Sequence, residues 1–126
     1  MSIKQATFSG SQALTTAFAS VTLAVPAVAT GPIALGGLWL YLTTLVTAAT
    51  LTVRITRDAV GDELVCPDFD AEIDVGATTA TDGSCIIDYD RIPFYGTSGV
   101  TSLYVWAKTN AGTITLTEAK LTLVTG

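Results

Sequence analysis

Apolar and polar residues alternate with a period of two along most of the chain, which is the pattern of strands that bury one face. Leu51, Val53 and Ile55 point one way, and Thr52 and Arg54 point the other. The alternation recurs at 71–75, at 85–90, at 103–108 and from Ile114 onward. Turn residues separate these runs at Asp58–Asp62, Asp82-Gly83 and Asn110–Gly112. The pattern predicts about eight or nine short strands.

The last strand contains a change of parity. Ile114 and Leu116 occupy even positions, whereas Leu121 and Leu123 occupy odd ones. A regular strand cannot turn all four side chains to one side without an extra residue. We therefore expect a β-bulge or bend within Thr117–Ala119.

The N-terminal half shows a similar change. Leu14, Thr16 and Phe18 occupy even positions, whereas Val21, Leu23 and Val25 occupy odd ones, which predicts a bend near Ala19-Ser20. Proline and glycine predict a loop over Pro26–Gly37. The strand expected next, Leu38–Val46, is apolar on both faces, so it is either central or covered by another subunit.

No segment carries the 3.6-residue apolar stripe of an amphipathic helix, and no repeat of fixed period occurs. We expect an all-β fold: an antiparallel β-sandwich of about eight strands, formed by residues 1–126 as a single domain.

Charge is unevenly distributed. No residue between Lys4 and Arg54 is charged, whereas the part from Arg54 to Gly126 holds all eleven acidic and five of the six basic residues. The charge-free segment must be buried, coated with Ser and Thr, or covered by a partner. The net charge of −5 opposes binding to nucleic acid or to an anionic membrane.

A membrane-spanning segment is an alternative interpretation of residues 33–51, because this window is uncharged. Gly36-Gly37 interrupts this window, and Leu38, Leu40 and Leu42 alternate with Trp39 and Tyr41 in the period of a strand. We expect neither a membrane-spanning helix nor a signal peptide.

Catalytic and metal-binding patterns are weak. The chain has no histidine and two cysteines, which disfavours Ser or Cys nucleophiles and zinc sites. We expect no enzyme activity, no cofactor and no metal.

The acidic run at 68, 70, 72 and 74 could hold calcium, but a solvated strand face fits its spacing better. Asp88 and Asp90 could be a glycosidase pair, and two outward acids on a strand is the favoured interpretation.

Cys66 and Cys85 could form a disulfide across a hairpin. Because no signal peptide is expected, two buried free thiols are the favoured alternative.

Two aromatic pairs occupy strand faces, Trp39 with Tyr41 and Tyr104 with Trp106. Exposed, they could stack on sugar rings, but packing at a subunit interface is favoured because interfaces are rich in Trp and Tyr. The expected interface comprises Leu38, Trp39, Leu40, Tyr41, Leu42, Tyr104 and Trp106.

The C-terminal half has a familiar pattern. Three segments resemble the strands of small virion proteins of tailed bacteriophages: the run 103–113, the strand 120–123, and the strand 51–57 with the acidic turn that follows it. The similarity covers about Leu51 to Val124 in its β-pattern and turns. It implies a jelly-roll or related sandwich that decorates or cements a capsid, usually as a trimer.

These observations lead to one hypothesis and one alternative. The chain is expected to be a non-enzymatic virion protein on the capsid surface, produced in the host cytoplasm. Its expected partners are other copies of itself, as a homotrimer, and the major capsid protein, which the charge-free segment contacts. The alternative is a carbohydrate-binding β-sandwich module that uses one of the aromatic pairs.

Overall fold

The computed structural model describes residues 2–24, 33–43, 50–73, 82–94 and 102–125. They form eight strands: β1 (Ser2–Leu14), β2 (Ala19–Ala24), β3 (Ile33–Thr43), β4 (Thr50–Thr56), β5 (Phe69–Glu72), β6 (Gly83–Phe94), β7 (Ser102–Thr109) and β8 (Ile114–Thr125). Within these ranges, no helix is long and apolar enough to cross a membrane.

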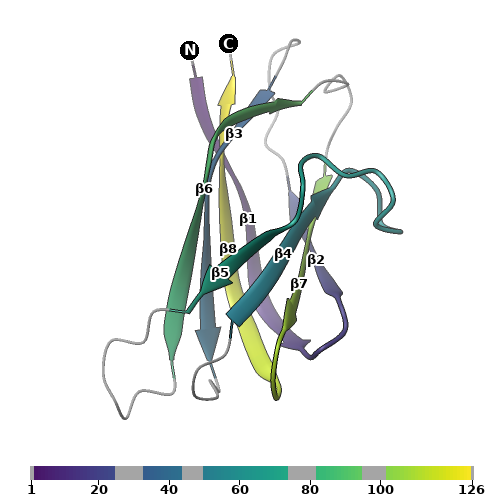
Figure 1. Ribbon diagram of the computed structural model, residues 1–126. Coiled ribbons are helices and arrows are strands. Elements are labelled where there is room, and N and C mark those ends of the chain that lie inside the picture. Colours follow the sequence, from purple (N-terminus) through teal and green to yellow (C-terminus); the bar gives the residue numbers. More distant parts are fainter. Residues whose placement is uncertain (1, 25–32, 44–49, 74–81, 95–101, 126) are drawn as a thin grey trace.

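All eight strands belong to one antiparallel sheet in the order β5-β4-β7-β2-β1-β8-β3-β6. The sheet curls until its two edge strands, β5 and β6, contact each other, so that it forms a nearly closed barrel (Figure 1). The all-β, antiparallel prediction is confirmed, and so is the expected number of about eight strands.

The strand pairs are nested along the chain. The first strand pairs with the last, β2 pairs with β7, β3 with β6, and β4 with β5. Ser2 lies opposite Thr125, so the two ends of the chain lie side by side (Figure 1). The fold is therefore a single long hairpin wrapped around one core.

That core is formed by the inward side of the strands. On β4, Leu51, Val53 and Ile55 have no exposed surface, as their alternation predicted. Leucines of β3 and β8 and the apolar residues of β7 join them in one continuous cluster. Burial of these side chains is the main stabilising contribution, at ~25 cal/mol per Å² of apolar surface.

The bulge predicted in the last strand is confirmed, and Thr117 is the extra residue. Tyr41 of β3 pairs with Glu118, whereas its neighbour Leu42 pairs with Leu116, so Thr117 has no partner on β3. Leu116 and Ala119 are consequently both buried. The Thr117 hydroxyl donates a hydrogen bond to the backbone oxygen of Tyr41 (3.1 Å), which fixes the bulge.

Several predicted boundaries were wrong. The short apolar run Leu64–Cys66 before Pro67 also predicts a strand, but among the described residues it makes one isolated bridge, between Leu64 and Thr56. The corner between the first strands lies at residues 15–18, just before the predicted bend. β1 itself was not predicted from the sequence.

Two strands are longer than predicted. β3 begins at Ile33, so Gly36-Gly37 lies inside a strand, at a shift in its pairing with β6 and β8. β6 continues through Pro93, which pairs with Ala34. Proline is tolerated there because β6 is an edge strand in this sheet. The remainders of the predicted Pro26–Gly37 loop and Leu38–Val46 strand lie outside the described residues.

Side-chain packing closes the seam between β5 and β6. Phe69 of β5 contacts Tyr89 of β6 edge to face, with ring centroids 5.1 Å apart. Cys66 and Cys85 are buried in the same core cluster, and both are free thiols, as the favoured interpretation held. The Tyr89 hydroxyl is buried and has no hydrogen-bond partner among the described residues.

Deletion of Thr117 tests the role of the bulge. It should turn Ala119, Leu121 and Leu123 away from the core and prevent folding, because a one-residue slip reverses the facing of a strand. The variant Thr117→Ala keeps the residue count and should cost only about 1 kcal/mol for the lost hydrogen bond. Urea unfolding followed by circular dichroism measures the stability of both variants. A deletion variant as stable as Thr117→Ala would contradict the assignment.

The thiols give a second prediction. Because both are buried, native protein should react slowly with a thiol reagent, whereas unreduced protein in denaturant should consume two equivalents, one for each cysteine. Consumption of none would show that the cysteines form a disulfide.

Stability should fall at high pH. Burial raises the pKa of both Cys66 and Cys85 to about 11, above the ordinary thiol value of 9.0. Between pH 9.0 and about 11, the folded state holds more protons than the unfolded state, so raising the pH favours unfolding. We expect this contribution to be complete below pH 9 and lost between pH 9 and about 11. The variant Cys66→Ala/Cys85→Ala should flatten the curve over this window, and an unchanged slope would contradict the prediction.

Candidate functional site

The residues of the expected interface do not share one surface. Leu38, Leu40 and Leu42 face the core and have no exposed surface, so they stabilise the fold. Trp39 and Tyr41 alternate with them on the outward side of β3. Tyr104 and Trp106 point outward from β7, which is separated from β3 in the sheet by β2, β1 and β8.

The outward side of β5, β4, β7 and β2, called here the paired face, is occupied by contacts within the chain. The Trp106 indole N–H donates to the Thr56 hydroxyl (2.8 Å), which donates in turn to the backbone oxygen of Asp58 (2.8 Å). Gly61, at φ 93°, lies so close to the Trp106 ring that an added Cβ would be 3.2 Å from it. Trp106 therefore anchors the turn after β4.

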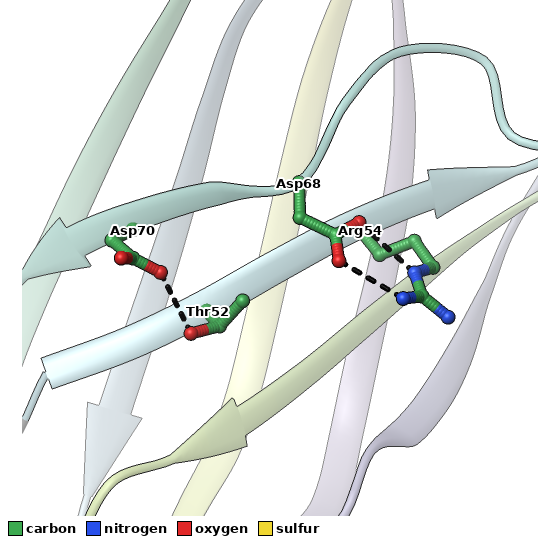
Figure 2. Close-up of polar contacts among 4 residues, drawn as sticks. All are labelled: Thr52, Arg54, Asp68 and Asp70. Atoms are coloured by element: carbon green, nitrogen blue, oxygen red, sulfur yellow. Dashed lines mark hydrogen bonds and ion pairs between the residues drawn. The ribbon is translucent and has the colours of Figure 1, made fainter.

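Charged groups on the paired face pair with one another (Figure 2). Arg54 donates two hydrogen bonds of 2.9 Å to the Asp68 carboxylate, which raises the pKa of the guanidinium above its ordinary value. Phe18 lies beneath both Arg54 and Lys108, whose cationic groups are 4.4 and 4.7 Å from the ring centroid. Such contacts hold the corner between β1 and β2 against β4 and β7.

Two of the acidic residues here, Asp68 and Asp70, have hydrogen-bond partners within the chain. Asp68, Asp70 and Glu72 are exposed and alternate with inward Phe69 and Ala71, so for these three the predicted solvated strand face is confirmed. The Thr52 hydroxyl donates to Asp70 (2.7 Å) (Figure 2). In the described part of the chain, no three Cys, Asp or Glu side chains gather as they would around a metal ion. Asp74 and the Asp90 side chain lie outside what the structure describes.

Asp58 closes the turn itself. Its carboxylate accepts the backbone N–H of Glu63 (2.9 Å) and that of Asp62 (3.2 Å). These hydrogen bonds, led by that of Glu63, favour the ionised form and hold the pKa of Asp58 below its ordinary value. The contact is that of a turn-closing aspartate, with no feature of a catalytic acid.

The outward side of β1, β8, β3 and β6, called here the open face, is different because it contains a groove. Residues opposite one another form rows across the four strands. One row contains Thr7, Lys120, Trp39 and Ile86, and Gln5 pairs with Thr122 in the next. In that second row β3 contributes Gly37, opposite Asp88 of β6. Gly37 thus leaves a gap beside the Trp39 side chain.

The groove has a volume of about 400 Å³. It is lined by Gln5, Gly37, Leu38, Trp39, Ile86, Lys120 and Thr122. An added Cβ at Gly37 would approach only the Ile87 oxygen, at 3.7 Å, so the space above this glycine is open. Ile86 is 72% exposed, which gives the groove an apolar wall.

Neighbouring side chains position the indole of Trp39. The Tyr41 ring lies 5.9 Å away, and its hydroxyl donates to Asp82 (3.1 Å), so that the aromatic pair is tied to the start of β6. This hydrogen bond raises the pKa of Tyr41, so its hydroxyl keeps the proton. The Lys120 ammonium lies 5.5 Å from the Trp39 ring centroid, and among the described residues it has no carboxylate partner in an ion pair.

Sequence reasoning placed Trp39 and Tyr41 on one strand face but missed Gln5, Gly37, Ile86, Lys120 and Thr122. These residues come from four strands, and only the register of the sheet brings them together. The one available signal was Gly36-Gly37, which the sequence analysis assigned to a loop. Comparisons with known proteins do not assign the site: no protein-family model matches the chain, and a search of curated proteins finds no match.

Proposed function

We propose that this chain is a non-enzymatic virion structural protein, a decoration or cement subunit that stabilises a tailed-phage head. It would be produced in the host cytoplasm and act on the capsid surface by binding the major capsid protein. The resemblance of residues 51–124 to small phage virion proteins falls on β4, β7 and β8 and the turns beside them.

The order of the strands supports this proposal. A jelly roll is an eight-stranded hairpin wrapped into two four-stranded sheets, an architecture common in viral capsid and lectin domains. Here β1 and β2 share a single register pair, Thr7 opposite Ala24. If the sheet is divided there, the halves are β1-β8-β3-β6 and β2-β7-β4-β5, each composed of two nested pairs. We interpret the nearly closed sheet as a jelly roll on this basis.

The observation that carries the proposal is a group of uncharged, exposed side chains on the outward sides of β1 and β2. Its exposed positions are Thr7, Ser9, Ser11, Thr22 and Ala24, called here the neutral corner. Burying an ionised side chain against a partner costs several kcal/mol, whereas hydroxyls and methyl groups cost much less. Across the sheet, Thr7 lies opposite Lys120 and Ser9 lies opposite Glu118 of β8, so the uncharged patch is limited to these positions of β1 and β2. Such a patch is suited to permanent contact with another protein.

The structure changes the argument for a trimer. Within the described residues, the apolar side chains of the charge-free segment, such as Leu14, Leu23 and Leu40, are already buried in the subunit's own core. A single copy therefore does not need a partner to cover them. The proposed homotrimer rests on the resemblance and on the closed symmetry that lets identical copies share one interface.

A carbohydrate-binding module is the second candidate function. The groove beside Trp39 favours it, because it combines an aromatic ring with hydrogen-bonding side chains on an exposed face. The Tyr104 and Trp106 pair does not favour it, because Trp106 is occupied by Thr56 and Gly61.

Sedimentation with the phage particle whose genome encodes this chain tests the proposed function. Purified protein should bind the particle, and Ser11→Lys/Thr22→Lys should reduce binding at least ~10-fold because each ammonium must be desolvated in the contact. The control Ala59→Lys/Val60→Lys adds the same two charges to the exposed turn after β4 and should bind normally.

Absence of binding by the unaltered protein would contradict the decoration role, and normal binding by the double variant would contradict the neutral corner. Light scattering tests the trimer separately. A stable monomer at micromolar concentration would refute the homotrimer in solution and limit assembly to the capsid surface.

A further inference from the structure

The groove beside Trp39 has features that attachment through the neutral corner does not require. Its aromatic wall, Trp39, lies on β3, two strands along the sheet from β1. We propose that this groove binds one pyranose ring of an uncharged glycan. The inference deepens the second candidate function, the carbohydrate-binding module, and rests on it; it does not depend on the capsid role, because it concerns a different set of side chains.

The shape and polarity of the groove fit a sugar ring. Its volume of about 400 Å³ is within the range of small-molecule sites, ~300–1,000 Å³. A pyranose has an apolar face of C–H groups, which stacks on an aromatic ring, and a rim of hydroxyls that need hydrogen bonds. Trp39 and Ile86 offer the apolar surface, and Gly37 lets the ring approach the backbone of β3.

Polar groups stand at the rim of the groove. The Gln5 amide offers both a donor and an acceptor, the Thr122 hydroxyl offers the same, and Lys120 offers donors. The Lys120 ammonium lies over the Trp39 ring on a flexible stem, so it can turn to the hydroxyls of a sugar stacked there.

The charges around the groove favour a neutral ligand. Lys120 is the cation at its rim, but Asp88 lies opposite Gly37 and Glu118 lies opposite Tyr41 on the same face. With both signs present, the groove has no single-sign field to concentrate an anion or a cation. The amide of Gln5, the hydroxyl of Thr122 and the ammonium of Lys120 at the rim are suited to the hydroxyls of an uncharged sugar, which both donate and accept.

The aromatic wall is also held in place before a ligand arrives. Tyr41 packs against Trp39 and is tied by its hydroxyl to Asp82. A wall that is already ordered loses little conformational freedom on binding, which favours weak but specific recognition of a single ring.

The two tryptophans allow a direct test by NMR, because Trp39 lies in the groove and Trp106 lies on the paired face. The probes are neutral oligosaccharides of glucose, mannose, galactose, xylose and N-acetylglucosamine, with polygalacturonate as the anionic arm, each up to ~10 mM to reveal millimolar sites. At least one neutral probe should shift the Trp39 indole N–H and the Gly37 amide and leave the Trp106 indole unchanged.

Filling the groove provides the matched variant. Gly37 does not have a positive φ and its outward side is open, so Gly37→Val should fold while its methyl groups occupy the sugar's place. We expect affinity to fall at least ~10-fold. The control Ala13→Val adds methyl groups at an exposed position of β1 that does not line the groove, and it should bind normally.

Three results would overturn the proposal. No probe shifts the Trp39 indole N–H resonance, or polygalacturonate is the one probe that shifts it, or Gly37→Val binds the neutral sugar as well as the unaltered protein does. Loss of particle binding in Gly37→Val, with no sugar shift in the unaltered protein, would assign the groove to a protein partner instead. Failure of the decoration role would be seen separately, in the particle sedimentation of the unaltered protein.

Discussion

The extra residue in β8 is the constraint on which both the core and the open face depend. β8 pairs with β1 on one side and β3 on the other, so its register fixes half of the sheet. Thr117 lets Leu116 and Ala119 both face inward. The same shift turns Lys120 and Thr122 outward, where they line the groove. One bulge therefore determines both which residues form the core and which are offered to a ligand.

The two outer faces of the barrel use polar residues in different ways. On the paired face, Arg54 is held by Asp68 and Trp106 by Thr56, so these side chains hold the corner and the turn of the fold in place. Exposed ion pairs of this kind contribute little stability, ~0–1 kcal/mol, but they leave few groups unmatched. Cations lie over aromatic rings on both faces, Arg54 and Lys108 over Phe18 and Lys120 over Trp39. The feature that distinguishes the open face is the groove beside Trp39, on which the glycan proposal rests.

The sequence predicted those parts of the fold that local pattern controls. The parity change located the bulge, and alternation located β4 and β7, because one buried face forces a period of two. β1 was not predicted because its two faces differ little in polarity. Its inward side includes the small Ala6, and its outward side is mostly Ser, Thr and Gln. Nothing local reveals the seam between β5 and β6 or the order of the eight strands, since these depend on contacts between distant segments. The groove belongs to the same class, because Gln5, Trp39 and Lys120 meet only through register.

The same architecture explains why the N-terminal segment carries no charge. It contributes β1, β2 and β3, and its apolar residues fill the core while hydroxyl groups cover much of its outward side. Thr and Ser keep such strands hydrated without fixing a charge beside a partner. The acidic residues that give the chain its net charge lie instead beyond Arg54, many of them in or beside β5 and β6. These are the edges of the sheet, and charge on an edge opposes pairing with a foreign strand. Charge at these edges thus opposes edge-to-edge pairing, while β1 and β2 carry the uncharged side chains that the proposed capsid contact would use.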